Sequence, residues 1–203
     1  MIQYFLERPY LILLMAALIV LTLFVCVKAG QASSRRSKEV EKIMKKLKEE
    51  NLLRNEFSAL TDSLVASSEP ARLFRGVALN LQKKVSDAAD MNAEFESLTS
   101  GQKAIYALSF VAEYGGEKLS EFFKSNGQPL TGAALDAVKN LFGGKVAEIF
   151  EAEYNAFDSE NEEVSFVVSE IESLDAEFSK LISTEELSAV SGRFVAENKD
   201  MFM

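Results

Sequence analysis

The chain has 203 residues, with 22 lysine and arginine side chains against 31 aspartate and glutamate side chains, one cysteine and no histidine. Without histidine, this sequence excludes a Ser-His-Asp triad, a Cys-His dyad and imidazole metal ligands. A single cysteine excludes an intramolecular disulfide framework and a multi-cysteine zinc site. The length suits one soluble domain of about 100–150 residues together with an attachment.

Close to the N-terminus lies an uncharged apolar run of 18 residues, YLILLMAALIVLTLFVCV, from Tyr10 to Val27. As a helix it measures about 27 Å, close to the hydrocarbon thickness of a bilayer. A cleaved signal peptide is the alternative, and small residues after the run keep it open, but signal peptides usually have an apolar region of about 7–15 residues. We therefore predict a retained transmembrane helix over residues 9–28, preceded by a short extracytoplasmic segment, 1–8.

Basic residues are distributed unequally around this run. Only Arg8 precedes it, whereas eight follow: Lys28, Arg35, Arg36, Lys38, Lys42, Lys45, Lys46 and Lys48. Because basic flanks stay on the cytoplasmic side, this asymmetry predicts an outside N-terminus and a cytoplasmic C-terminal domain. The same eight side chains are candidates for contact with anionic lipid headgroups, although a basic collar that only sets topology explains them as well.

The charge of the rest of the chain has the opposite sign. Residues 28–48 contain eight bases and two acids, a balance of +6, whereas residues 49–203 contain 13 bases and 28 acids, a balance of −15. Nucleic acid repels such an acidic body, so we expect no direct binding of DNA or RNA by residues 49–203.

Helical periodicity continues through the remaining sequence, and no alternating strand pattern persists. We predict an all-α protein with a basic juxtamembrane linker and helix over 29–69 and an acidic multi-helix domain over 70–203. The first helix is expected over 36–66, packing on its own domain or on a neighbour, with a short coiled coil as the alternative. Further helices are expected over about 71–90, from Thr99, around Leu119–Phe123, around Leu135–Phe142 up to Gly143-Gly144, around Val146–Phe157, over 160–182, and from Thr184 to about Asn198.

Chemistry-bearing motifs are scarce. The sequence has no phosphate-binding, dinucleotide-binding or nucleophile-elbow pattern, and the acidic stretch at 158–163 lacks the glycine of a calcium loop. We therefore predict a non-enzymatic protein with no catalytic residue, no metal and no cofactor. The residues that stand out as a candidate partner-binding acidic face are Glu160, Glu162, Glu163, Glu170, Glu172, Asp175, Glu177, Glu185 and Glu186.

Short motifs in the last half of the chain resemble a known family. They are LTSGQKAIYAL (98–108), EFFKSNG (121–127), AALDAVKNLFGGKVAEIFEAEYNAF (133–157), LDAEFSKL (174–181) and FVAENKDMF (194–202). In this order they resemble the bacterial domain-of-unknown-function family typified by DNA mimic protein 19, with a departure at residues 116–119. The resemblance implies an all-α domain that often self-associates and, as in the namesake of the family, an acidic face standing in for DNA phosphates. A membrane anchor is not typical of this family, and we expect the predicted span to lie in the bacterial inner membrane.

Two functional hypotheses follow. The first is a single-pass membrane-anchored interaction module, an accessory subunit or adaptor of other membrane proteins, that displays its acidic domain in the cytoplasm. The second is a membrane-tethered acidic decoy that sequesters a basic DNA-binding protein, which salt and competing DNA would release. A homo-oligomer built on residues 36–66 is a third, weaker option.

Overall fold

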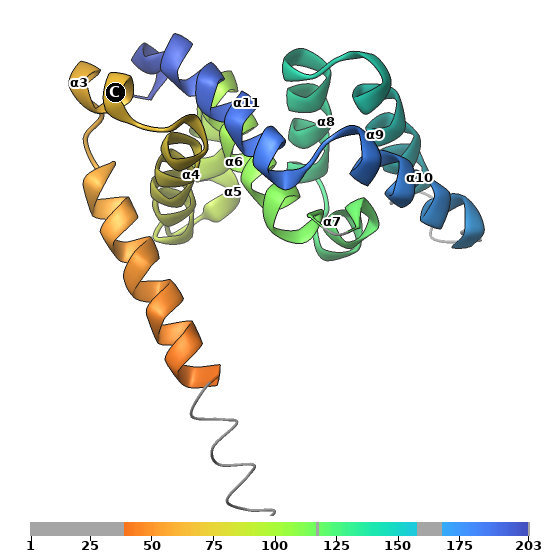
Figure 1. Cartoon of the computed structure of the whole chain (residues 1–203), viewed down its shortest axis with the longest axis horizontal. Coiled ribbons are helices and arrows are strands. Elements are labelled where there is room, and N and C mark those ends of the chain that lie inside the picture. The colour runs from red at the N-terminus through yellow and green to blue at the C-terminus, as the bar shows by residue number, and fades with distance from the viewer. Residues whose placement is uncertain (1–38, 117, 158–167, 203) are drawn as a thin grey trace, which may run out of the picture. The chain divides into compact units, whose positions relative to one another are not determined.

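The computed structural model describes residues 39–116, 118–157 and 168–202, and throughout these ranges the regular secondary structure is helical (Figure 1). The all-α prediction is confirmed for this part of the chain. The predicted segments 1–8 and 9–28 lie outside the described residues. Among the helices that are described, none combines the length and apolar composition needed to cross a bilayer. The chain divides into two units, Met1–Glu49 and Glu50–Met203.

The helix predicted over 36–66 is shorter than expected. Described helical residues run from 39 to 56, and a separate helix, α3, spans Asp62–Ser67. The break follows from capping, because the Thr61 hydroxyl accepts a hydrogen bond from the Leu64 N–H at 3.3 Å and so begins a new helix. Leu53 and Phe57 are nevertheless buried in the core of the second unit. Compact packing therefore begins at Glu50, ahead of the expected start of the domain at residue 70.

Helix α4, Pro70–Ser86, has proline in its first turn and buries the predicted stripe of Leu73, Val77, Leu81 and Val85. A further helix, α5, spans Met91–Ser97 and was not expected. It begins where the Asp90 carboxylate accepts from the Ala93 N–H at 3.0 Å. Only Phe95 of this short helix is buried, which leaves almost no hydrophobic periodicity to reveal it.

Helix α6, Ser100–Tyr114, lies at the centre of the domain, where it packs on α4 and on three helices that follow it in the chain. Thr99 and Gln102 form a reciprocal capping box at its start, with bonds of 3.2 Å in each direction. The predicted residues Ile105, Leu108 and Val111 are all buried. Its end coincides with the predicted interruption at Gly115-Gly116.

Three helices then build the second half of the domain: α7 at Leu119–Ser125, α8 at Leu130–Leu141 and α9 at Gly144–Ala156. Gly143 and Gly144 have φ values of 59° and 50°, in the region that glycine adopts without strain. The Gly143 N–H donates to the Val138 carbonyl at 3.1 Å, which closes the end of α8. The predicted glycine cap is therefore confirmed.

The last helices are α10, Val168–Leu181, and α11, Thr184–Glu197, followed by the 3-10 turn η1 at Lys199–Met201. The cap of α11 is Ser183, one residue before the predicted Thr184, and its side chain accepts from the Glu186 N–H at 3.1 Å. Helix α11 returns along α4, whereas α10 packs on α9 and α7 (Figure 1). The acidic residues of α10 and α11 are thus attached to different parts of one core.

Candidate interaction surface

The acidic residues predicted to bind a partner have different positions in the structure. Glu160, Glu162 and Glu163 lie outside the described residues. Of the rest, α10 carries exposed Glu170, Glu172 and Glu177, and the first turn of α11 carries exposed Glu185 and Glu186. Carboxylates in a first helical turn are stabilised by the N–H groups there, which gives the last two a structural role as well.

Asp175 does not belong to the exposed acidic face. Its side chain is buried, and its two oxygens accept from the N–H and the hydroxyl of Ser120 at 2.8 and 2.7 Å. Ser120 is the second residue of α7, whose cap residue, Lys118, has no capping side-chain bond. Asp175 therefore supplies from α10 the acceptor that the start of α7 lacks. This correction removes it from any solvent-facing binding surface.

Glu177 is exposed but paired. Its carboxylate lies 3.6 Å from the Lys145 ammonium on α9, with both side chains largely in solvent. For Glu170, Glu172, Glu185 and Glu186, by contrast, no ion pair occurs within the described part of the chain. We refer to these four residues as the α10–α11 acidic set. They are the predicted face residues whose charge the described structure leaves uncompensated.

Sequence analysis did not identify one buried acidic residue. Glu153 on α9 is fully buried, and neither carboxyl oxygen has a hydrogen-bond partner among the described residues. Burial, and after it the charge of Asp175, raise the pKa of Glu153 from its ordinary 4.5 to about 8, and Lys124 opposes the shift. The spacing could have revealed it, because Glu153 follows Phe150 by three residues and thus falls on the apolar face of α9.

Aromatic side chains surround this region. Phe123 contacts Phe150, Tyr154 and Phe157 with ring centroids 5.1, 6.3 and 5.6 Å away. Beside them is a cavity of about 140 Å³ lined by Phe123, Asn126, Gly127, Gln128, Thr131, Tyr154 and Phe157. The Gln128 amide donates to the Tyr154 hydroxyl at 2.6 Å across its rim. The predicted aromatic core is therefore present, with a modest space at one side.

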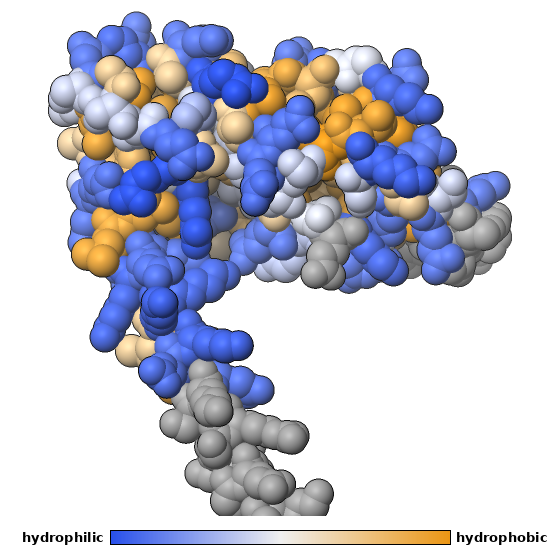
Figure 2. All heavy atoms as spheres, in the orientation of Figure 1, coloured by the Kyte–Doolittle hydropathy of each residue, from blue (hydrophilic) through white to orange (hydrophobic). Residues whose placement is uncertain are grey.

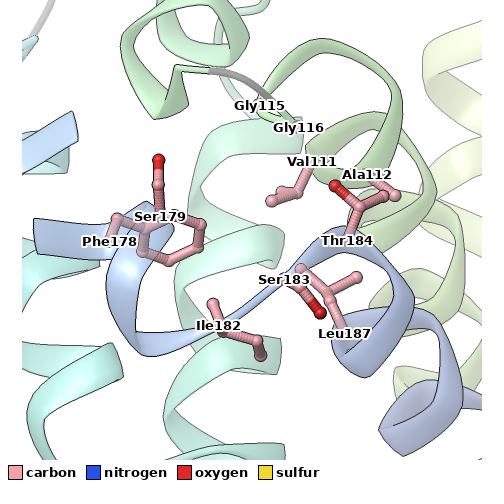
Figure 3. A pocket seen from close by; sticks show the side chains of 10 residues that line it. All are labelled: Val111, Ala112, Gly115, Gly116, Phe178, Ser179, Ile182, Ser183, Thr184 and Leu187. Atoms are coloured by element: carbon pink, nitrogen blue, oxygen red, sulfur yellow. The ribbon is translucent and has the colours of Figure 1, made fainter. Parts of the chain in front are cut away.

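A second crevice lies where α6 ends and α11 begins (Figure 3). Gly115 and Gly116 form one wall, while Ser179, Ser183 and Thr184 approach from the other side. Its volume is about 10 Å³, which is room for about one water molecule. It is therefore a packing gap rather than a site for a small molecule.

The predicted lipid-contact residues are only partly described. Lys28, Arg35, Arg36 and Lys38 lie outside the described residues, whereas Lys42, Lys45, Lys46 and Lys48 are exposed on the described helical residues 39–56. Lys45 lies 4.0 Å from Glu49 one turn later. Within the described ranges, no three acidic, cysteine or histidine side chains are grouped closely enough to hold a metal ion.

No protein-family model, no curated protein and no solved structure matches this chain. The resemblance to the DNA mimic protein 19 family therefore stays a prediction that rests on its short motifs.

Proposed function

We propose that this chain is a non-enzymatic, single-pass membrane-anchored interaction module, an accessory subunit or adaptor with its acidic helical domain in the cytoplasm of a bacterial cell. The α10–α11 acidic set carries the proposal. Its four exposed carboxylates have no ion pair within the described residues, and their negative charge favours a basic partner and speeds its association. The apolar run at 10–27 and the bases after it support the anchor and its orientation.

An apolar surface on the same domain supports recognition of a protein rather than of a simple counter-ion. Figure 2 shows hydrophobic side chains gathered over the region of α8 and α9, with hydrophilic residues around them. Protein interfaces typically combine an apolar centre with a polar rim. The partner that fits this domain is therefore a protein that offers both an apolar contact and basic residues.

A pull-down from detergent-solubilised membranes tests the proposal. Full-length tagged chain is compared with a variant in which the α10–α11 acidic set is changed to glutamine, E170Q/E172Q/E185Q/E186Q. We expect membrane proteins to co-purify with the parent chain and to be depleted at least tenfold with the variant. The matched control, E69Q/E113Q/D136N/E148Q, removes the same charge from exposed acids elsewhere on the domain. Equal recovery with both variants would contradict a role for the α10–α11 acidic set.

Salt and DNA separate the adaptor from the decoy. A partner held by apolar contact as well as by charge is retained in part at 0.5 M salt and fully in excess duplex DNA, because salt screens only the electrostatic attraction and DNA does not compete for the apolar contact. A DNA-binding protein that both treatments release would replace the adaptor proposal by the decoy, which the family resemblance favours. If carbonate washing extracts the chain from membranes, the proposed transmembrane anchor is refuted.

A further inference from the structure

Residues 39–49 form an exposed helical segment with an apolar stripe. Val40, Ile43, Met44 and Leu47 are 58, 58, 50 and 47% exposed, which is unusual for four neighbouring aliphatic side chains of one helix. At about 100° per residue, their Cα positions fall within an arc of about 100°. That arc is the width of the face that a helix normally buries, so the stripe has the geometry of a contact surface without its contact.

Charged residues border the stripe in a regular order. Along one edge lie Glu39 and, two turns later, Lys46; along the other lie Glu41 and, again two turns later, Lys48. Each edge is therefore acidic at its N-terminal end and basic at its C-terminal end. The apolar residues between them are symmetric about the midpoint of residues 43 and 44.

This order distinguishes the two ways in which a pair of such helices can pack. In an antiparallel pair, each edge lies beside the same edge of the second copy, which runs in the opposite direction. Glu39 therefore approaches Lys46 of the second copy, and Glu41 approaches Lys48 of the second copy. In a parallel pair, opposite edges meet at nearly the same height. Lys46 then approaches Lys48 and Glu39 approaches Glu41, which places like charges together.

We propose that residues 39–49 pair antiparallel with the same segment of a second copy of this chain, with Val40 opposite Leu47 and Ile43 opposite Met44. The proposal rests on the membrane anchoring proposed above. Four half-exposed side chains per copy bury far less than the roughly 1,200 Å² of the smallest standard interfaces. Confinement to one membrane raises the effective concentration enough for a small interface to form.

An anionic lipid surface is the competing occupant. Within 39–49 the four lysines are nearly balanced by Glu39, Glu41 and Glu49, and two of these acids border the stripe itself. Acids at the edge of an apolar stripe oppose insertion between anionic headgroups, whereas they complete a helix pair. Charge therefore favours a second copy.

Disulfide cross-linking reads out the pairing directly. Two differently tagged full-length chains, both carrying Cys26→Ser, receive Val40→Cys and Leu47→Cys respectively, and isolated membranes containing both are oxidised. An antiparallel pair links position 40 to position 47 and yields a product with both tags. In an antiparallel pair, position 40 lies about 10 Å along the helix axis from position 40 of the other copy, which is too far for a disulfide. A product linking 40 to 40 shows a parallel pair and overturns the proposal.

Charge exchange provides the matched controls. K46E/K48E makes both edges entirely acidic, and E39K/E41K makes both edges entirely basic. Two copies of either variant repel each other, so each variant should reduce the 40–47 product at least tenfold. Coexpression of the two variants, and the fourfold exchange E39K/E41K/K46E/K48E in one chain, should restore it. A stripe that lies in lipid gives a different result, because E39K/E41K would strengthen its attachment to vesicles containing phosphatidylglycerol and no variant would restore cross-linking.

The anchor and the pair fail in distinguishable ways. Carbonate washing and flotation report whether the chain is anchored, and cross-linking is read in whichever fraction contains it. Anchored chain without a 40–47 product overturns the pair and leaves the anchor standing. Chain that washes off the membrane refutes the anchor, and if it also gives no 40–47 product, the pair is overturned as well.

Discussion

Replacing Glu153 by glutamine examines a carboxyl group that is enclosed where α9 packs on α7 and α10. The side chain has no exposed surface, and in the part of the chain that the structure describes neither oxygen has a hydrogen-bond partner. Its pKa rises to about 8 because burial disfavours the charged form and because the charge of Asp175 lies nearby. The folded protein therefore holds this carboxyl in its protonated form at neutral pH.

The direction of the pH effect follows from the two states of the chain. In the unfolded chain, Glu153 loses its proton around its ordinary pKa of 4.5, whereas in the folded protein it keeps the proton up to about pH 8. Its stabilising contribution is complete below pH 4.5 and is lost as the pH rises through about 8. At about 1.4 kcal/mol per pKa unit, the loss amounts to about 5 kcal/mol of unfolding free energy.

Glutamine at position 153 keeps the shape of the side chain but does not ionise. The buried amide has two unpaired N–H donors where the protonated carboxyl has one O–H, and this further unpaired donor costs about 1–3 kcal/mol at low pH, where ionisation of the parent contributes little. Above pH 8 the parent has lost about 5 kcal/mol and the variant has not. We therefore expect Glu153→Gln to be less stable than the parent at pH 4.5 and about 2–4 kcal/mol more stable at pH 8.5.

Urea unfolding between pH 4.5 and 9 measures this crossing. The full chain is kept in a nonionic detergent, and unfolding is followed by near-ultraviolet circular dichroism of the packed aromatic side chains. Glu148→Gln, an exposed position on the same helix, is the control and should follow the parent at every pH. A constant difference between Glu153→Gln and the parent across this range would refute a carboxyl held neutral by burial.

Other contacts give three further expectations, each measured by urea unfolding of the full chain at pH 7. Asp175→Ala leaves the Ser120 N–H and hydroxyl unpaired and should cost about 2–4 kcal/mol, against about 1 for Ser120→Ala. Thr99→Ala removes the capping box of α6 and should cost about 1 kcal/mol. Gly192→Ala would place a Cβ 1.8 Å from the Pro70 carbonyl oxygen, so α11 must move from α4 at a cost of at least about 2 kcal/mol.

Long helices with several large apolar residues could be predicted from sequence, because a repeated spacing of three or four residues leaves little ambiguity. The buried stripe of α4 and the capped start of α6 are examples. Helix α5 was not predicted because it buries only one phenylalanine. Its start depends on the Asp90 cap rather than on a repeated spacing of apolar residues. The break in the helix at residues 57–61 was not predicted for a related reason. Thr61 caps a new helix, while the helical spacing of the apolar residues continues across the break.

The candidate surface was less predictable than the fold. A list of acids along α10 treats all of them as equivalent, yet Asp175 points into the core and Glu177 pairs with Lys145. Both outcomes depend on contacts with α7 and α9, which are distant in sequence. Sequence spacing specifies the face of one helix but not which neighbour covers it.

The different environments of the acids change how the charge of the domain should be interpreted. A balance of −15 over residues 49–203 treats every carboxyl as an exposed unit charge. Glu153 is neutral at pH 7, Asp175 is committed to the start of α7, and acids such as Glu56 and Glu151 are paired with arginine or lysine. Because paired charges contribute little to a long-range field, the field that a partner meets comes mainly from exposed, uncompensated carboxylates such as the α10–α11 acidic set. Partner selection should therefore follow the position of those residues rather than the total charge.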